Sequence, residues 1–242
     1  MHKRDTAGLN ALLLLSNEFL RKDLQKVKEY SMQVVKRSDP KNEVKWLVSA
    51  YSYLVTYYQQ TGKIDSAQYF LNQGEALVRA NPSNFRVKFN YNQSAGLFYK
   101  NLGDYKRALP YVLENVNTWK KEDENKAGQL LNLGNLYFNM GEYKNAADAH
   151  IKSLQLFENL KNLRGQSFCY QSLGNDFLFL NQYANAKKYF ERSLALKEQL
   201  DDKRGQLTTT ISLGDVHKEL NENQKAEGYY KSALATARSM KL

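Results

Sequence analysis

The chain has 242 residues, of which 42% are hydrophobic, so it can bury a core without disulfide bonds. Its single cysteine and three separated histidines exclude an internal disulfide and a Cys/His metal cluster. The net charge of +10 would suit an acidic partner, a nucleic acid or an anionic membrane surface. The basic residues are spread along the chain, however, which favours ordinary solvated faces.

The first predicted element is an apolar helix over residues 9–15, behind the basic residues 1–4. This beginning superficially resembles a signal peptide, but no small-residue cleavage site follows it. The continuation fits an amphipathic helix and a turn. No apolar run in the chain reaches the roughly 20 residues that span a bilayer.

A repeated pattern follows along the rest of the chain. Gly134, Gly174 and Gly214 each follow a leucine and lie 40 residues apart, and an alanine comes twelve residues after each glycine. The pattern continues toward the N-terminus at spacings of 38 and 41 residues, and more loosely over the first forty residues. Such self-similarity predicts stacked structural repeats. We expect a single domain over 1–242 with six repeats, at about 5–40, 43–82, 84–121, 124–161, 164–201 and 204–241.

Each repeat is predicted to be a helical hairpin. In the fourth repeat, apolar residues recur at helical spacing on both sides of a break at Gly141. Gly134 lies inside the first helix, where glycine costs about 1 kcal/mol relative to alanine. We expect a partner helix to approach there, with Ala146 as the matching small surface. Pro110 is tolerable in the first turn of a helix and would kink the helix if it lay deeper.

The Leu-Gly pair, the aromatic residues, the Gly-x-Tyr segment and the later alanine resemble a tetratricopeptide repeat over essentially the whole chain. The 40-residue spacing, with Arg-Gly-Gln at 164–166 and 204–206, is similar to two subgroups: spindle-orientation adaptors of animal cells, and sensory arrays of bacterial histidine kinases and transcription regulators. The resemblance implies an all-α, right-handed superhelical solenoid of about six stacked hairpins. In that fold the first helices line a concave groove that holds an extended peptide or a helix of another protein.

From this resemblance we expect a non-catalytic scaffold for protein or peptide binding, forming the sensory or interaction segment of a larger signalling protein such as a bacterial regulator. Polar residues opposite the Leu-Gly side of the first helices are the predicted binding residues. They are Gln93, Asn101, Asn132, Asn135, Asn139, Gln171, Ser172, Asn175, Ser212 and Asp215, together with Tyr53. A carboxamide both donates and accepts, so Asn135 and Asn175 are suited to hold a peptide backbone. The alternatives are bonding to a neighbouring hairpin for these amides and N-terminal packing for Tyr53.

Other functions find less support in the sequence. No phosphate-binding glycine loop occurs, and Cys169 and His150 lie where core residues are expected, so we predict no enzyme activity, no cofactor and no small-molecule cofactor site. The basic residues fall mainly on second helices, so nucleic acid is not the expected partner. A clamp for a terminal carboxylate is not expected either, because Lys88 and Asn92 have the spacing but are out of register.

Self-assembly is the alternative function. The last predicted repeat ends without a polar capping helix, so the ends of the solenoid could pair and form a homo-oligomer. The compartment stays open at this stage: the chain as given suggests the cytoplasm, whereas a segment of a bacterial membrane sensor would lie in the periplasm.

Overall fold

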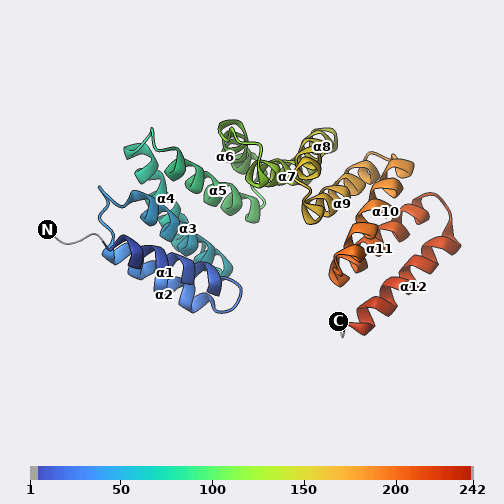
Figure 1. The fold of residues 1–242 in the computed structure, drawn as a ribbon, viewed down its shortest axis with the longest axis horizontal. Helices are drawn as coiled ribbons and strands as arrows, with labels where there is room; N and C mark the ends of the chain where they lie inside the picture. Colours follow the sequence, from blue (N-terminus) through green and yellow to red (C-terminus); the bar gives the residue numbers. More distant parts are fainter. Residues whose placement is uncertain (1–4, 241–242) are drawn as a thin grey trace. The chain divides into compact units, whose positions relative to one another are not determined.

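The computed structural model describes residues 5–240, and within this range the chain forms twelve helices and no strand (Figure 1). The prediction of an all-α helical repeat is confirmed. The basic residues 1–4 and the last residue of the sixth predicted repeat, 241, lie outside the described range. The helices are α1 (Thr6–Phe19), α2 (Leu24–Arg37), α3 (Val44–Gln60), α4 (Ile64–Ala80), α5 (Phe85–Asn101), α6 (Tyr105–Thr118), α7 (Glu124–Asn139), α8 (Tyr143–Asn159), α9 (Leu163–Phe179), α10 (Tyr183–Gln199), α11 (Lys203–Glu219) and α12 (Asn223–Ser239).

The helices belong to two compact units. Unit 1 extends to Asn115 and contains α1 to α5 and most of α6, while unit 2 begins at Val116 and contains α7 to α12. Consecutive helices pack as hairpins, and within each unit the first helix of one hairpin also contacts the first helix of the next, as α3 contacts α5 and α7 contacts α9. The single domain over 1–242 stays a prediction.

The turn inside the second to sixth hairpins is encoded locally. Gly62, Gly103 and Gly141 have positive φ angles of 74°, 76° and 78°, which glycine adopts without steric cost. The next two repeats place Asn181 and Asn221 there, both with φ of 58°, and asparagine tolerates this region better than most residues. The same turn is therefore built with two residue types.

Capping residues and prolines set where the helices begin. Asn162 and Asp202 accept hydrogen bonds from the backbone N–H groups three residues on, at 2.8 and 2.9 Å, and so cap α9 and α11. Pro40 and Pro82 lie in turns outside the helices. Pro110 is the sixth residue of α6, deeper than the first turn.

The Leu-Gly face is packed inside the hairpin, but its partner differs from the expected alanine. A Cβ at Gly134 would lie 2.3 Å from the ring of His150, and one at Gly174 would lie 2.4 Å from the ring of Phe190. At Gly214 the nearest atoms belong to Tyr230, at 2.5 Å. The glycine makes room for a ring sixteen residues later. The helical period alone does not predict which ring faces the glycine, because that contact depends on how the second helix is rotated about its axis.

Candidate functional site: the groove of the first helices

A groove of about 290 Å³ runs along the first helices of unit 1. Tyr53 on α3 and Gln93 on α5, both predicted binding residues, line it together. Its wall includes Leu20, Ser49, Tyr53, Asn90, Gln93 and Leu97, and we call it the amide groove. Residues from three successive hairpins thus come together on one surface.

A second hollow of about 540 Å³ shares Ser49 and Asn90 with the amide groove and continues it toward the first turns of α3 and α5. Lys45, Trp46 and Arg86 line this part, which we call the basic hollow. None of these three residues was predicted from the sequence. The repeated basic residue at one helix position is the sequence signal for Lys45 and Arg86.

The predicted binding residues occupy four positions of one helix face. The positions are counted from Gly96, Gly134, Gly174 or Gly214, or from Val55, which occupies the equivalent place in α3. Three residues before it lie Gln93 and Gln171; two before it lie Tyr53, Asn132, Ser172 and Ser212; one after it lie Asn135, Asn175 and Asp215; five after it lie Asn101 and Asn139. The first three positions line the amide groove in unit 1, where Thr56 and Leu97 represent the third. Asn101 is not among the groove residues and ends α5.

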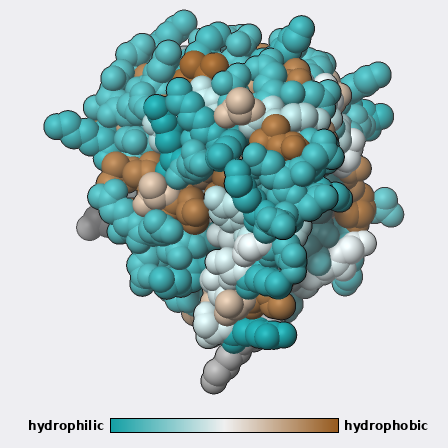
Figure 2. All heavy atoms as spheres, turned by 90° about the vertical axis from the view of Figure 1, so that its right-hand side faces the viewer, coloured by the Kyte–Doolittle hydropathy of each residue, from teal (hydrophilic) through white to brown (hydrophobic). Residues whose placement is uncertain are grey.

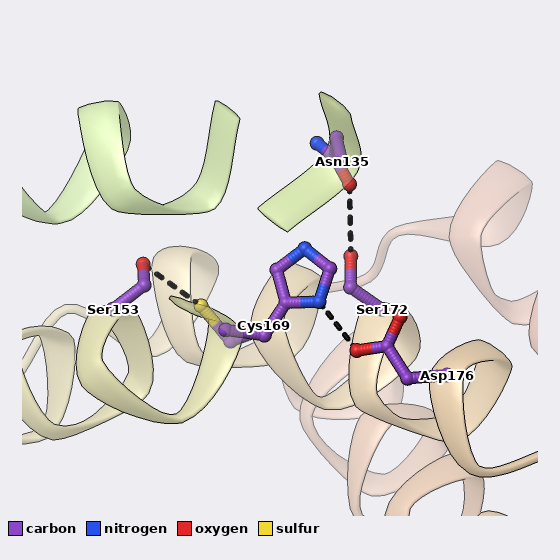
Figure 3. A network of polar contacts seen from close by, with 6 residues as sticks. Asn135, Ser153, Cys169, Ser172 and Asp176 are labelled. Atoms are coloured by element: carbon purple, nitrogen blue, oxygen red, sulfur yellow. Dashed lines mark hydrogen bonds and ion pairs between the residues drawn. The ribbon is translucent and has the colours of Figure 1, made fainter. Parts of the chain in front are cut away.

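Several predicted residues bond to the neighbouring hairpin. Ser172 donates to the side-chain oxygen of Asn135 at 3.5 Å, between α9 and α7 (Figure 3). Gln171 donates to Ser212 at 3.2 Å, and Asn101 donates to Gln59 at 3.0 Å. These bonds correspond to the alternative interpretation of the amides, and they hold the first helices in register with one another.

The other predicted residues carry free polar groups. Gln93, Asn132, Asn139, Asn175 and Tyr53 form no side-chain hydrogen bond within residues 5–240, and each is at least partly exposed. Burial raises the pKa of Tyr53, so its hydroxyl stays neutral. These side chains can offer donors and acceptors to a ligand without breaking an existing bond.

Asp215 lies in a different setting. It accepts a hydrogen bond from the hydroxyl of Tyr230 at 2.8 Å, and partial burial together with this carboxylate raises the pKa of Tyr230 to about 12. Asp215 also lines a hollow of about 390 Å³ with Phe179, Lys218 and Glu219, at the ends of α9 and α11. It therefore contributes to the surface of unit 2 while one of its oxygens is engaged.

A buried polar pair that was not predicted from the sequence lies beneath this face in unit 2. His150, expected as a packed side chain, is buried, and its Nδ1 lies 2.6 Å from Oδ2 of the buried Asp176 (Figure 3). Burial raises the pKa of Asp176, and the bond to His150 opposes part of that rise. The corresponding places in other repeats hold apolar residues such as Phe190 and Leu136. The sequence signal for this pair is Asp176, a carboxylate at a repeat position that is apolar in the neighbouring repeats.

Two further buried groups complete the interior of unit 2. Cys169 donates to the hydroxyl of Ser153 at 3.3 Å, and burial raises the pKa of its thiol to about 11, so it is a packed and protonated core residue. Lys197 is only 3% exposed and donates to Gln171 at 2.9 Å and to Thr209 at 2.7 Å. Gln171 is therefore tied to the interior as well as to Ser212.

Three other expectations concern features away from the groove. Lys88 forms an ion pair with Glu114, and Asn92 donates to the same carboxylate at 2.9 Å, so both side chains already have a protein partner. Residues 5–240 contain no group of three or more side chains that could hold a metal ion. Within the same range, no helix combines the length and the apolar character needed to cross a bilayer.

The self-assembly alternative depends on helices such as α12. Leu234 on this helix is 51% exposed, whereas Leu154, at the same place two repeats earlier, is 8% exposed. Figure 2 shows one face of the molecule, on which hydrophilic side chains separate smaller hydrophobic patches. Pairing through the ends stays a prediction.

Comparison with known proteins adds to this geometry. Residues 126–199 and 182–239 match the tetratricopeptide repeat family. No curated protein matches the chain in sequence.

Solved structures match nearly the whole chain in fold. A STAND signal-transduction ATPase with a tetratricopeptide repeat sensor, from Pyrococcus horikoshii, has a TM-score of 0.84 at 17% identity, over 98% of this chain and 36% of that protein. RapI has a TM-score of 0.79 at 12% identity, over 97% of this chain and 67% of RapI. BtubC from P. vanneervenii has a TM-score of 0.74 at 20% identity, over 96% of this chain and 92% of BtubC. At these identities the likeness shows the fold alone, and the chain spans about a third of the ATPase.

Proposed function

We propose that the chain, which matches the tetratricopeptide repeat family over residues 126–199 and 182–239, is a non-catalytic scaffold that binds an extended peptide segment of another protein along its first helices. Repeat solenoids use extended surfaces of this kind to bind partners. The observation that carries the proposal is the amide groove, where Tyr53 and Gln93 from successive hairpins line one hollow of about 290 Å³.

The chemistry of the amide groove suits an extended peptide. A carboxamide such as that of Gln93 can pair with the N–H and the C=O of a peptide backbone, which an extended ligand leaves unpaired. Tyr53 offers a large apolar surface and a hydroxyl group, and its side chain loses little conformational freedom on binding. The free amides of Asn132 and Asn175 would extend the same kind of contact along unit 2.

We further propose that the chain serves as the sensory or interaction segment of a signalling protein. The support for this role is the likeness in fold to the ATPase, which carries its tetratricopeptide repeats as a sensor. The match covers 36% of that protein. In the proposed role, an effector domain outside the matched part would convert peptide binding into a signal.

Binding of defined peptides tests the proposal. Peptides would be selected on the wild-type chain from a phage-displayed library of random dodecapeptides, synthesised, and measured by fluorescence anisotropy. We expect Tyr53→Ala/Gln93→Ala to weaken their binding by at least about tenfold, because both residues line the groove and present the polar and aromatic groups proposed to contact the peptide.

The matched control is Tyr69→Ala/Gln73→Ala on α4, where Tyr69 is 57% exposed and neither residue lines the groove. This variant should bind like the wild type, and circular dichroism melts should show that both variants are folded. If the selected peptides bind the groove variant as tightly as the wild type, or if no peptide is selected, the proposed function is wrong.

A further inference from the structure

We propose that the peptide bound by unit 1 carries an acidic segment next to an apolar segment, and that the basic hollow receives the acidic one. This inference rests on the function proposed above and names the chemical class of the partner.

The basic hollow gathers cationic side chains from two helices. Lys45 is the second residue of α3 and Arg86 is the second residue of α5, and both line the same hollow of about 540 Å³. Trp46 also lines the basic hollow, and the ammonium of Lys45 lies 3.9 Å from the centroid of its ring. The positive ends of the dipoles of α3 and α5 point to this edge and add to its attraction for carboxylates.

Lys45 and Arg86 form no ion pair within residues 5–240, whereas other basic residues of unit 1 do. Arg79, for example, pairs with Glu75 at 2.6 Å. Glu43 lines an adjoining hollow together with Lys45, and its carboxylate accepts a hydrogen bond from the backbone N–H of Asp39 at 2.8 Å. The two cations are therefore available to a carboxylate from outside the chain.

The other end of the combined surface is apolar. Leu20, Tyr53 and Leu97 line the amide groove, and Leu97 is 44% exposed. Ser49 and Asn90 lie where the two hollows meet, and Asn90 donates to Ser49 at 3.4 Å. The surface thus passes from basic through amide to apolar, which is the complement of an acidic segment followed by an apolar one.

Unit 2 carries basic residues at the same helix position. Arg164 and Arg204 precede Gly174 and Gly214 by ten residues, as Lys45 precedes Val55 and Arg86 precedes Gly96. Both arginines are exposed. Four of the five repeats in which this register is defined therefore place a cation in the first turn, and the fourth repeat has Glu124 there. This periodicity points to a binding role for the position in unit 1.

A peptide fits this surface better than a nucleic acid does. Single-stranded nucleic acids need a positive groove that follows the backbone over several nucleotides, with aromatic rings for the bases. Here the cations are confined to one end, and leucine side chains and amides line the rest. The aromatic ring at the basic end, Trp46, is already covered by Lys45.

Charge reversal in the full chain tests the inference with the same dodecapeptide library. We expect peptides selected on the wild type to be enriched in Asp and Glu beside apolar residues, and to bind less tightly as NaCl rises from 50 to 500 mM. Lys45→Glu/Arg86→Glu should weaken their binding at least tenfold and should instead select peptides enriched in Lys and Arg. Lys63→Glu/Lys106→Glu changes the net charge equally on exposed residues outside both hollows and should leave the binding unchanged.

The remaining outcomes separate this inference from the proposed function. Peptides that depend on Tyr53 and Gln93 but show no acidic enrichment would overturn the acidic-segment inference and leave the proposed function standing. Failure to select any peptide would overturn both. A mixed-sequence single-stranded RNA of twelve nucleotides serves as the competitor. If it displaces a labelled selected peptide at a lower concentration than the same unlabelled peptide does, the ligand of this surface is a nucleic acid and the acidic-segment inference is wrong.

Discussion

Lys197 holds an ammonium group inside unit 2, at the place where the preceding repeat has Phe157. Its stem fills apolar space, and its three donors face Gln171 and Thr209 rather than an acidic partner. Burial removes water from the charge and lowers its pKa from 10.5 to about 8, while the more distant Asp202 partly opposes this effect. The charge is therefore a cost to stability at neutral pH.

The pH dependence of unfolding should reveal this cost. Between pH 8 and 10.5 the unfolded chain binds more protons at this lysine than the folded chain does, so the free energy of unfolding rises with pH through this group, by up to about 3 kcal/mol. Urea unfolding at pH 7.5 and pH 10 should show that Lys197→Met gains most relative to the wild type at pH 7.5.

Lys188→Met, on the exposed side of α10, is the control and should follow the wild type at both pH values. Thr209 can still donate to Gln171 at 2.6 Å in the Lys197 variant, so no acceptor is stranded. Parallel pH curves for Lys197→Met and the wild type would show that the ammonium is not desolvated as described.

At the scale of helices, the packing interface between α8 and α9 contains a buried polar pair, His150 and Asp176. Neither the second ring nitrogen nor the second carboxylate oxygen has a hydrogen-bond partner among the described residues. Replacing a buried ion pair with packed apolar residues is often neutral or stabilising, whereas removing one partner leaves an uncompensated polar group. Neighbouring repeats have buried apolar residues at the equivalent positions, Phe190 for His150 and Leu136 for Asp176.

A double-mutant cycle tests this joint. We expect Asp176→Leu and His150→Phe each to lower the free energy of unfolding by about 3 kcal/mol, since each leaves a polar partner unpaired in the core. The double variant His150→Phe/Asp176→Leu should be at least as stable as the wild type, because Gly134 leaves room for a ring as Gly174 does for Phe190. Additive losses in urea unfolding would show that the site does not accept the apolar pair.

At the scale of the whole chain, the two compact units each contain one tryptophan, Trp46 in unit 1 and Trp119 in unit 2. In a repeat protein each hairpin is stabilised mainly by its neighbours, so a local change need not spread through the chain. Single-tryptophan variants, Trp119→Phe and Trp46→Phe, would therefore report on units 1 and 2 separately.

Gly174→Ala tests this independence. The new methyl group would meet the ring of Phe190 at 2.4 Å, and we expect the overpacking to cost about 1–3 kcal/mol. The loss should lower the urea midpoint reported by Trp119 and leave the midpoint reported by Trp46 unchanged.

Gly128→Ala in α7 is the control, because a methyl group there meets nothing within 4 Å and should raise helix stability by up to about 1 kcal/mol. If Gly174→Ala moves both tryptophan midpoints together, the chain unfolds as one cooperative body and the two units are not independent.

Repetition made the fold predictable from the sequence. The glycine spacing of 40 residues and the helical periodicity around Gly141 identify a run of hairpins, and the same pattern identifies which face of each first helix is packed. Counting along the face opposite the packed one leads to Tyr53 and Gln93, which line the amide groove. Their role in binding remains a proposal.

The sequence by itself therefore determined the helical repeat, the turns and the packed face, because these depend on contacts between residues close in the chain and on a period seen several times. Only the tertiary structure decided which distant side chains meet. His150 and Asp176 are 26 residues apart, and Lys45 and Arg86 are 41 residues apart. The first two residues form a hydrogen bond and the second two line one hollow, and both arrangements depend on the rotation and spacing of neighbouring helices. Residue periodicity does not specify these, because a helix with a given apolar face can pack at several rotations.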